Sequence, residues 1–175
     1  MNGNLQELSA LLREGQRRSS QGSYRRRAPA DAALPYLQQA RHGLRLIAGQ
    51  HPGNTEAWRL LSQAEEALLD YRNARIALEK VVALEGGADR RDLKKLASLR
   101  EHEAWWDGLG VTPLQLEDLG RYLENMLSAS PCDHTPRHAR MWLEHSRLSN
   151  PDLIVRALED RSGYCDCGIL NNVVR

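Results

Sequence analysis

The chain has 175 residues and a formal net charge of +1, with 41 % hydrophobic and 27 % charged residues. This length can bury a hydrophobic core without the help of a disulfide or a metal. The balanced charge argues against a dedicated nucleic-acid or membrane-surface binder. No apolar run is long enough to span a membrane, and residues 1–12 lack the features of a secretory signal. We therefore expect an intracellular, cytoplasmic protein.

Leucine and alanine supply most of the apolar content, Phe is absent, and few segments are rich in β-branched residues. Because Leu and Ala favour helices whereas β-branched residues favour strands, this composition predicts an all-α fold. The three Cys stand in a chain with no signal segment, so they are expected to be reduced thiols or metal ligands rather than a disulfide framework.

A short helix is predicted over residues 4–14, where leucines recur at helical spacing and Asn4 can act as a cap. Residues 15–30 then contain Gly15, two arginine runs within 17–27, and Pro29. This composition predicts a basic, flexible linker. Two interpretations of the linker stay open, a solvated loop with some affinity for anions or a specific nucleic-acid patch.

Four further helices are expected in the middle of the chain, over residues 31–50, 55–69, 71–85 and 89–106. Turn residues separate them: Pro52 and Gly53 follow the first helix, and Gly86 with Gly87 stops the third.

The last third of the chain has three helix starts of one type, in which a capping residue precedes a Pro. They are Thr112-Pro113, Thr135-Pro136 and Asn150-Pro151. The capping side chain accepts hydrogen bonds from free amides, and Pro has no amide to leave unpaired. These starts predict helices over residues 113–128, 136–147 and 151–161, with a capping box between Thr112 and Gln115. The tail from Gly163 is expected to form a short irregular or strand-like segment or a final helical turn.

Residues of the middle region repeat with a 34-residue period, as in Ala40 and Ala74. The other pairs at this spacing are Leu37 and Tyr71, Leu44 and Leu78, Ile47 and Val81, and Tyr24 and Trp58. The two alanines would let neighbouring helices approach closely, and the larger residues would fill the groove between them.

This segment resembles the tetratricopeptide repeat family, most clearly between Thr55 and Glu85. The residues that fall on the family pattern are Trp58, Leu61, Ala64, Tyr71, Ala74, Leu78, Val81 and Leu84, with Ser62 in place of the usual Gly. The resemblance covers about residues 35–85 and implies stacked helical hairpins whose concave face holds a peptide or a helix of another protein.

Four residues are candidates for partner binding. Arg59, Gln63 and Glu66 lie on the face that the resemblance assigns to a partner, and Trp106 stands beside Trp105 at a helix end. Tryptophans are frequent anchors at protein interfaces. The alternatives are that the three polar residues are merely solvated and that the tryptophan pair joins the repeat to the terminal module.

All three cysteines lie near the C-terminus in two short boxes, Cys132-Asp133-His134-Thr135 and Cys165-Asp166-Cys167. Together the boxes offer Cys132, His134, Cys165 and Cys167, a donor set suited to tetrahedral zinc. His138, one helical turn after His134, could replace a ligand. The alternative is that the thiols pack as small apolar groups while His134 caps the helix or forms a hydrogen bond near its start.

The same region is similar to a small bacterial domain of unknown function. That resemblance rests on the C-D-H-T box, on Trp142-Leu143, and on the final stretch Gly163–Val173, and it covers about residues 110–174. An acidic residue usually follows the second box in that family, and here Gly168 takes its place. The resemblance implies a fold unit and no particular reaction.

These observations favour a binding protein over an enzyme. A thiol nucleophile with its base and orienting carboxylate could be formed by Asp133, His134, Cys165 and Asp166. However, no phosphate-binding loop, nucleophile elbow or metalloprotease motif occurs.

We expect three parts, over residues 1–30, 31–108 and 110–175. We expect an adaptor whose helical-repeat groove, capped by the Cys/His module, binds a protein or peptide. The alternative function is a metal- or redox-responsive regulator with a zinc site.

Overall fold

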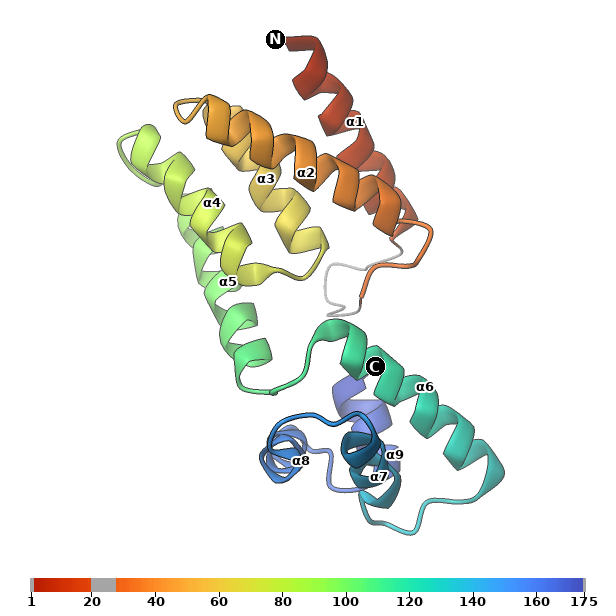
Figure 1. Cartoon of the computed structure of the whole chain (residues 1–175). Helices are drawn as coiled ribbons and strands as arrows, with labels where there is room; N and C mark the ends of the chain where they lie inside the picture. The colour runs from red at the N-terminus through yellow and green to blue at the C-terminus, as the bar shows by residue number, and fades with distance from the viewer. Residues whose placement is uncertain (1, 20–27, 175) are drawn as a thin grey trace. The chain divides into compact units, whose positions relative to one another are not determined.

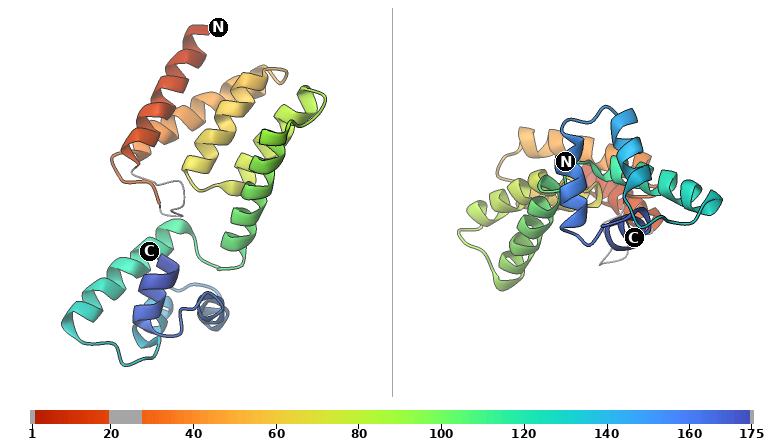
Figure 2. Two further views of the ribbon diagram at one scale, coloured as in Figure 1. Left: turned by 180° about the vertical axis from the view of Figure 1, so that it is seen from behind. Right: turned by 90° about the horizontal axis from the view of Figure 1, so that it is seen from below.

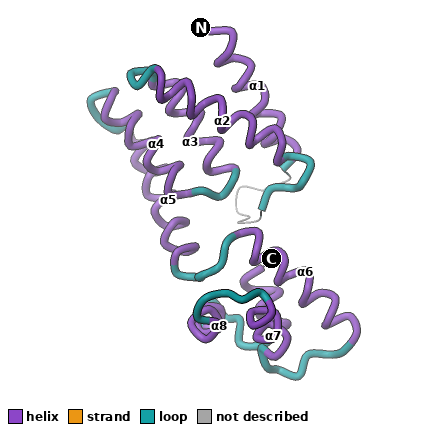
Figure 3. Tube along the Cα trace, in the orientation of Figure 1, coloured by secondary structure: helices purple, strands orange, loops and turns teal. Residues whose placement is uncertain are grey.

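The computed structural model describes residues 2–19 and 28–174, and within them every regular element is a helix (Figures 1 and 3). The all-α expectation is therefore confirmed. The elements are α1 (Asn2–Arg18), α2 (Leu34–Gln50), α3 (Thr55–Ala67), α4 (Tyr71–Leu84), α5 (Arg90–Asp107), α6 (Pro113–Ala129), α7 (Arg137–His145), α8 (Pro151–Glu159), α9 (Asp166–Gly168) and the π-helical segment η1 (Ile169–Val174). None of these helices is both long and apolar enough to cross a membrane.

The chain divides into two compact units, Met1–Ala104 and Trp105–Arg175. We expected the terminal module to begin at residue 110, after α5, whereas the division falls within the last turn of that helix.

In the first unit, α1 packs against α2, α2 against α3, and α3 against α4 (Figure 2). The two alanines of the 34-residue period, Ala40 in α2 and Ala74 in α4, are both fully buried. These two positions of the period therefore lie in the core of the unit. One of the other four pairs, Tyr24 with Trp58, depends on a residue outside the described ranges.

The predicted break at Gly15 is wrong, because α1 continues to Arg18. A Cβ atom built at Gly15 would lie 2.6 Å from Cδ2 of Leu37, and one at Gly43 would lie 2.5 Å from Cδ2 of Leu8. Both glycines therefore mark close contacts between α1 and α2 rather than helix ends. The remainder of the predicted basic linker, residues 20–27, lies outside the described residues.

Polar groups also join the helices of the first unit. The Ser62 hydroxyl donates a 2.8 Å hydrogen bond to the carbonyl of Ala74, linking α3 to α4 within the core. Glu65 of α3 is 1 % exposed and pairs with Arg45 of α2, with Nη2 2.6 Å from Oε1. Burial raises the pKa of Glu65 despite this partner, since desolvation penalises the charged carboxylate. The interior of this unit thus contains polar contacts as well as packing.

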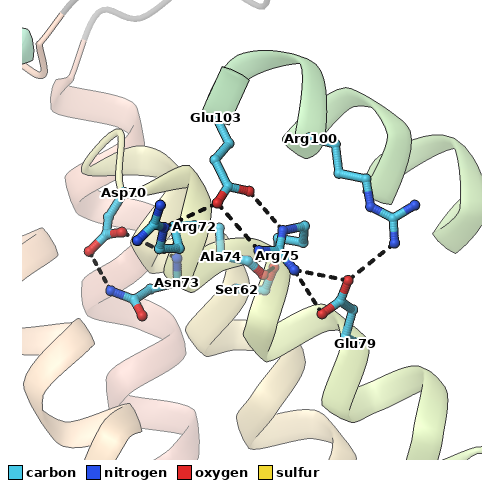
Figure 4. Close-up of polar contacts among 9 residues, drawn as sticks. All are labelled: Ser62, Asp70, Arg72, Asn73, Ala74, Arg75, Glu79, Arg100 and Glu103. Atoms are coloured by element: carbon cyan, nitrogen blue, oxygen red, sulfur yellow. Dashed lines mark hydrogen bonds and ion pairs between the residues drawn. The ribbon is translucent and has the colours of Figure 1, made fainter. Parts of the chain in front are cut away.

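An ion-pair network connects α4 to α5 (Figure 4). Arg75 Nε lies 2.7 Å from Glu103 Oε2, and Arg75 Nη1 lies 3.0 Å from Glu79 Oε2. Arg72 contacts the same Glu103 at 3.2 Å, and Arg100 contacts Glu79 at 3.2 Å. The hydrogen bond from Arg75 is the main reason why the pKa of Glu103 lies below its usual range. Shared partners of this kind align two helices more firmly than isolated surface pairs do.

The three predicted helix starts of the second unit turn out differently. At Thr112 the capping box is confirmed, with the Thr112 amide donating to Gln115 Oε1 at 2.8 Å and the Gln115 amide donating to Thr112 Oγ1 at 3.3 Å. Asn150 instead adopts a left-handed φ of 57°, and its side chain does not cap α8. Thr135 does not cap α7, which begins one residue later than expected, after Pro136. The tail is helical (α9 and η1) rather than strand-like.

Enlarging Ala74 should destabilise the first unit because there is no free space around a fully buried Cβ. We expect Ala74→Leu to lower the free energy of unfolding by about 1–3 kcal/mol. Ala83→Leu, on an exposed position of the same helix, should change it by less than about 0.5 kcal/mol. Urea denaturation of both variants measures the difference, and equal effects would contradict the packing described.

Candidate functional site

The three cysteines come together in the second unit. Cys132 lies in the loop between α6 and α7, Cys165 immediately precedes α9, and Cys167 is within α9. Their Sγ atoms all lie within 4.8 Å of one another, and the Sγ atoms of Cys165 and Cys167 are 3.2 Å apart. All three residues are partly exposed and none is in a disulfide. The convergence of the two boxes, inferred from the sequence, is therefore present for the thiols.

Asp166, between the two cysteines of the second box, holds the boxes together. Its carboxylate accepts the backbone amide of His138 at 3.0 Å and that of Ala139 at 2.9 Å, while its own amide donates to the carbonyl of Thr135 at 3.1 Å. These amides belong to the first turn of α7, where the preceding Pro136 has no side chain that can cap. Asp166 is 1 % exposed and supplies that missing cap from a distant part of the chain.

Local turns orient the boxes. Asp133 Oδ1 accepts both the amide (3.0 Å) and the hydroxyl (2.7 Å) of Thr135, which closes the turn after Cys132. In the second box, the Gly168 amide donates to Cys165 Sγ at 3.4 Å. This contact links the Cys165 side chain to the backbone of α9.

The surroundings of Cys132 and Cys167 shift the pKa values of these two thiols in opposite directions. The backbone amide of Cys167, together with that of His134, holds the pKa of Cys132 below its usual range. By contrast, hydrogen bonding to Cys165 and Cys132 raises the pKa of Cys167 to about 11. Three thiolates this close repel one another, so without a cation the last proton is hard to remove.

His134, the fourth ligand expected from the sequence, does not join the cluster. It has a left-handed φ of 64° and an exposed side chain, so its imidazole faces solvent while its amide faces Cys132. His138 is buried at the start of α7, with its Nε2 3.2 Å from Arg137 Nη2. The structure thus brings together three of the four predicted ligands.

The predicted partner-binding residues have varied surroundings. Arg59 of α3 pairs with Asp92 at 2.7 Å and Glu85 at 2.9 Å, and Glu66 pairs with Lys95 at 2.5 Å. Two of these side chains therefore bind groups of their own chain, whereas Gln63 is exposed. Trp106 is buried and packs edge-on against Trp105, with ring centroids 4.6 Å apart, so it is not the exposed anchor that its position suggested.

The capping role of Asp166 is not predicted from the sequence, which suggests only an orienting carboxylate for a thiol nucleophile. Both of its oxygens are bonded to α7 amides. A sequence signal existed, because a helix that starts after Pro136 needs a capping group from elsewhere. Nothing in the local sequence identified which acid would supply it.

The family model that matches this chain covers part of the second unit. Residues 119–172 match the family model described as Protein of unknown function (DUF2695), which is the kind of domain that the two boxes resembled. This match lies outside residues 35–85 and so adds no support for the tetratricopeptide resemblance. No solved structure matches the chain.

Two curated relatives are the uncharacterized protein Rv2271 of Mycobacterium tuberculosis and the uncharacterized protein Mb2294 of Mycobacterium bovis. Each is 37 % identical over 86 residues, which is 49 % of this chain and 86 % of the relative. The chain belongs to the family formed by these mycobacterial proteins.

The thiols should differ in reactivity when the protein is free of metal. Because alkylation needs the thiolate, Cys132, whose pKa is lowered, should react first. Cys167, with its pKa near 11, should react last, since about a thousandth of it is ionised at pH 8. Timed iodoacetamide labelling with a chelator present, read by peptide mass spectrometry, measures the order. Equal rates at Cys132 and Cys167 would contradict the environments described.

Removing the acceptor charge of Asp166 should loosen the start of α7. We expect Asp166→Asn to lower the free energy of unfolding by roughly 1–3 kcal/mol and to speed hydrogen exchange at the amides of His138 and Ala139. Asp160→Asn, at an exposed position, is the matched control and should change neither quantity. Unchanged exchange at both amides in Asp166→Asn would show that the cap does not form.

Proposed function

We propose that this protein binds a thiophilic divalent metal, zinc in particular, through Cys132, Cys165 and Cys167. The observation that carries the proposal is the approach of three Sγ atoms to within 4.8 Å of one another from two segments distant in sequence. Thiolate sulfur is the donor that selects zinc over magnesium or calcium. Cys132 and Cys165 lie outside the helices and Cys167 lies in the short helix α9, and sets of Cys ligands of this kind are common in structural zinc sites.

The electrostatics of the cluster favour this use. Proximity to the other two thiols raises the pKa of Cys167 to about 11, so three thiolates cannot coexist at neutral pH without a compensating positive charge. A divalent cation supplies that charge and releases the protons. Backbone amides already lower the pKa of Cys132 and so favour its thiolate, which prepares this residue for a metal.

The role of the metal on this proposal is to fasten the two boxes to each other. Asp166 already joins the second box to α7 through backbone amides, and a metal would join the same segments through side chains. The bound form would then be more stable than the free form by an amount that depends on metal concentration. The proposal assigns no catalysed reaction to the chain.

An adaptor role for the first unit is the second candidate. Helices α1–α4 pack in chain order with buried alanines at the repeat positions, as the tetratricopeptide resemblance implies. Exposed large apolar side chains on this unit, Leu46, Ile76, Leu84 and Leu93, support a protein or peptide as the partner. On this interpretation Gln63 contributes to the partner-binding face, the metal site stabilises the second unit, and the protein acts in the cytoplasm.

Protein purified without added zinc should contain about one equivalent of the metal, lost on chelation together with thermal stability. At a free zinc concentration of about 100 times Kd, binding should add about 2.7 kcal/mol to the free energy of unfolding. Replacing any one of the three cysteines by Ser should weaken zinc binding by more than about tenfold.

Tyr164→Phe is the matched control, because Tyr164 is 68 % exposed and adjoins Cys165 without supplying sulfur. This variant should bind zinc as the wild type does. Absence of zinc after purification, combined with no thermal shift on adding zinc, would refute the proposed function.

A further inference from the structure

A tetrahedral metal held by three cysteines needs one more donor, and the nearby carboxylates are already engaged. Both oxygens of Asp166 accept α7 amides, and Asp133 Oδ1 accepts two bonds from Thr135. The imidazole of His134 is exposed. A further carboxylate would also add negative charge to three thiolates, whereas a neutral imidazole would not.

His138 has an unusual environment for a histidine with no metal nearby. Its side chain is 8 % exposed, and its Nδ1 is buried without a hydrogen-bond partner among the described residues. Its Nε2 has a contact, 3.2 Å from Arg137 Nη2. A buried imidazole nitrogen without a partner is costly, so a movement of the ring that gives it new partners would remove a penalty.

The backbone of His138 is fixed next to the second box. Its amide donates to Asp166 Oδ2 at 3.0 Å, and Asp166 lies between Cys165 and Cys167 in the chain. The imidazole does not belong to the group of donor atoms that lie within 4.8 Å of one another. Coordination therefore requires rotation of the His138 side chain or closure of the short loop before α9.

We infer that the fourth metal ligand is the imidazole of His138, which closes onto the three cysteines when the metal binds. This inference rests on the proposed metal binding and replaces His134 as the histidine of the site. The resulting donor set, three thiolates and one neutral imidazole, is a common one for structural zinc. If Nδ1 is the ligand, closure gives this unpartnered atom a bond to the metal. If Nε2 is the ligand, closure ends its contact with Arg137, and Nδ1 gains a rearranged hydrogen bond.

Cobalt(II) substitution of the full chain tests the inference, because the visible bands of cobalt report the donors directly. We compare His138→Ala, His134→Gln and His145→Gln, the last an exposed histidine of α7 that serves as the control. The expected result is an altered spectrum in His138→Ala alone, with affinity reduced beyond the roughly 10–100-fold loss that follows from changes behind a ligand. Added imidazole should restore the wild-type bands of His138→Ala, which a purely structural role would not allow.

A wild-type spectrum in His138→Ala, or an altered one in His134→Gln, would overturn the inference. A separate measurement avoids any dependence on the folding of the variant: long-range ¹H–¹⁵N spectra of the wild type with and without zinc. The ring nitrogens of His138 should change to the pattern of a metal-bound imidazole, and those of the other histidines should not. If the wild type forms no cobalt–thiolate bands, the proposed function itself fails.

Discussion

The hydrogen bonds between the Asp166 carboxylate and the first amides of α7 are the interaction on which the arrangement of the three cysteines, and so the proposed metal site, depends. A helix that starts after proline leaves several amides without partners, and a buried carboxylate alone would be costly. Each satisfies the other, and the positive end of the helix dipole adds to the attraction. Because the acid lies between two cysteines, satisfying the helix also positions Cys165 and Cys167 near Cys132.

This arrangement makes the three thiols mutually unfavourable as anions and jointly favourable as ligands. The same closeness that raises the pKa of Cys167 lets one cation contact all three sulfurs. Folding positions the three sulfur donors, and on the proposed function metal binding would in turn stabilise the folded state. The proposed site would then be both a product of the fold and a source of its stability.

Much of the fold could be predicted from the sequence, because helix periodicity, the Thr112 capping box and the buried alanines are local or strictly periodic signals. The predicted helix end at Gly15 is wrong. A glycine can either end a helix or leave room for a neighbouring side chain, and only the position of Leu37 distinguishes the two. The cysteine cluster could be anticipated from donor chemistry. The outward turn of His134 and the long-range cap by Asp166 could not, because both depend on how α7 and α9 pack.

The first unit also combines packing with polar contacts, since its alanines at the repeat positions are buried while Ser62 and Glu65 each bind a group on a neighbouring helix. The most direct test of the central claim is zinc-edge X-ray absorption of the zinc-loaded chain. The account predicts three sulfur neighbours at about 2.3 Å and one nitrogen at about 2.0 Å. A zinc shell made only of oxygen and nitrogen would contradict it.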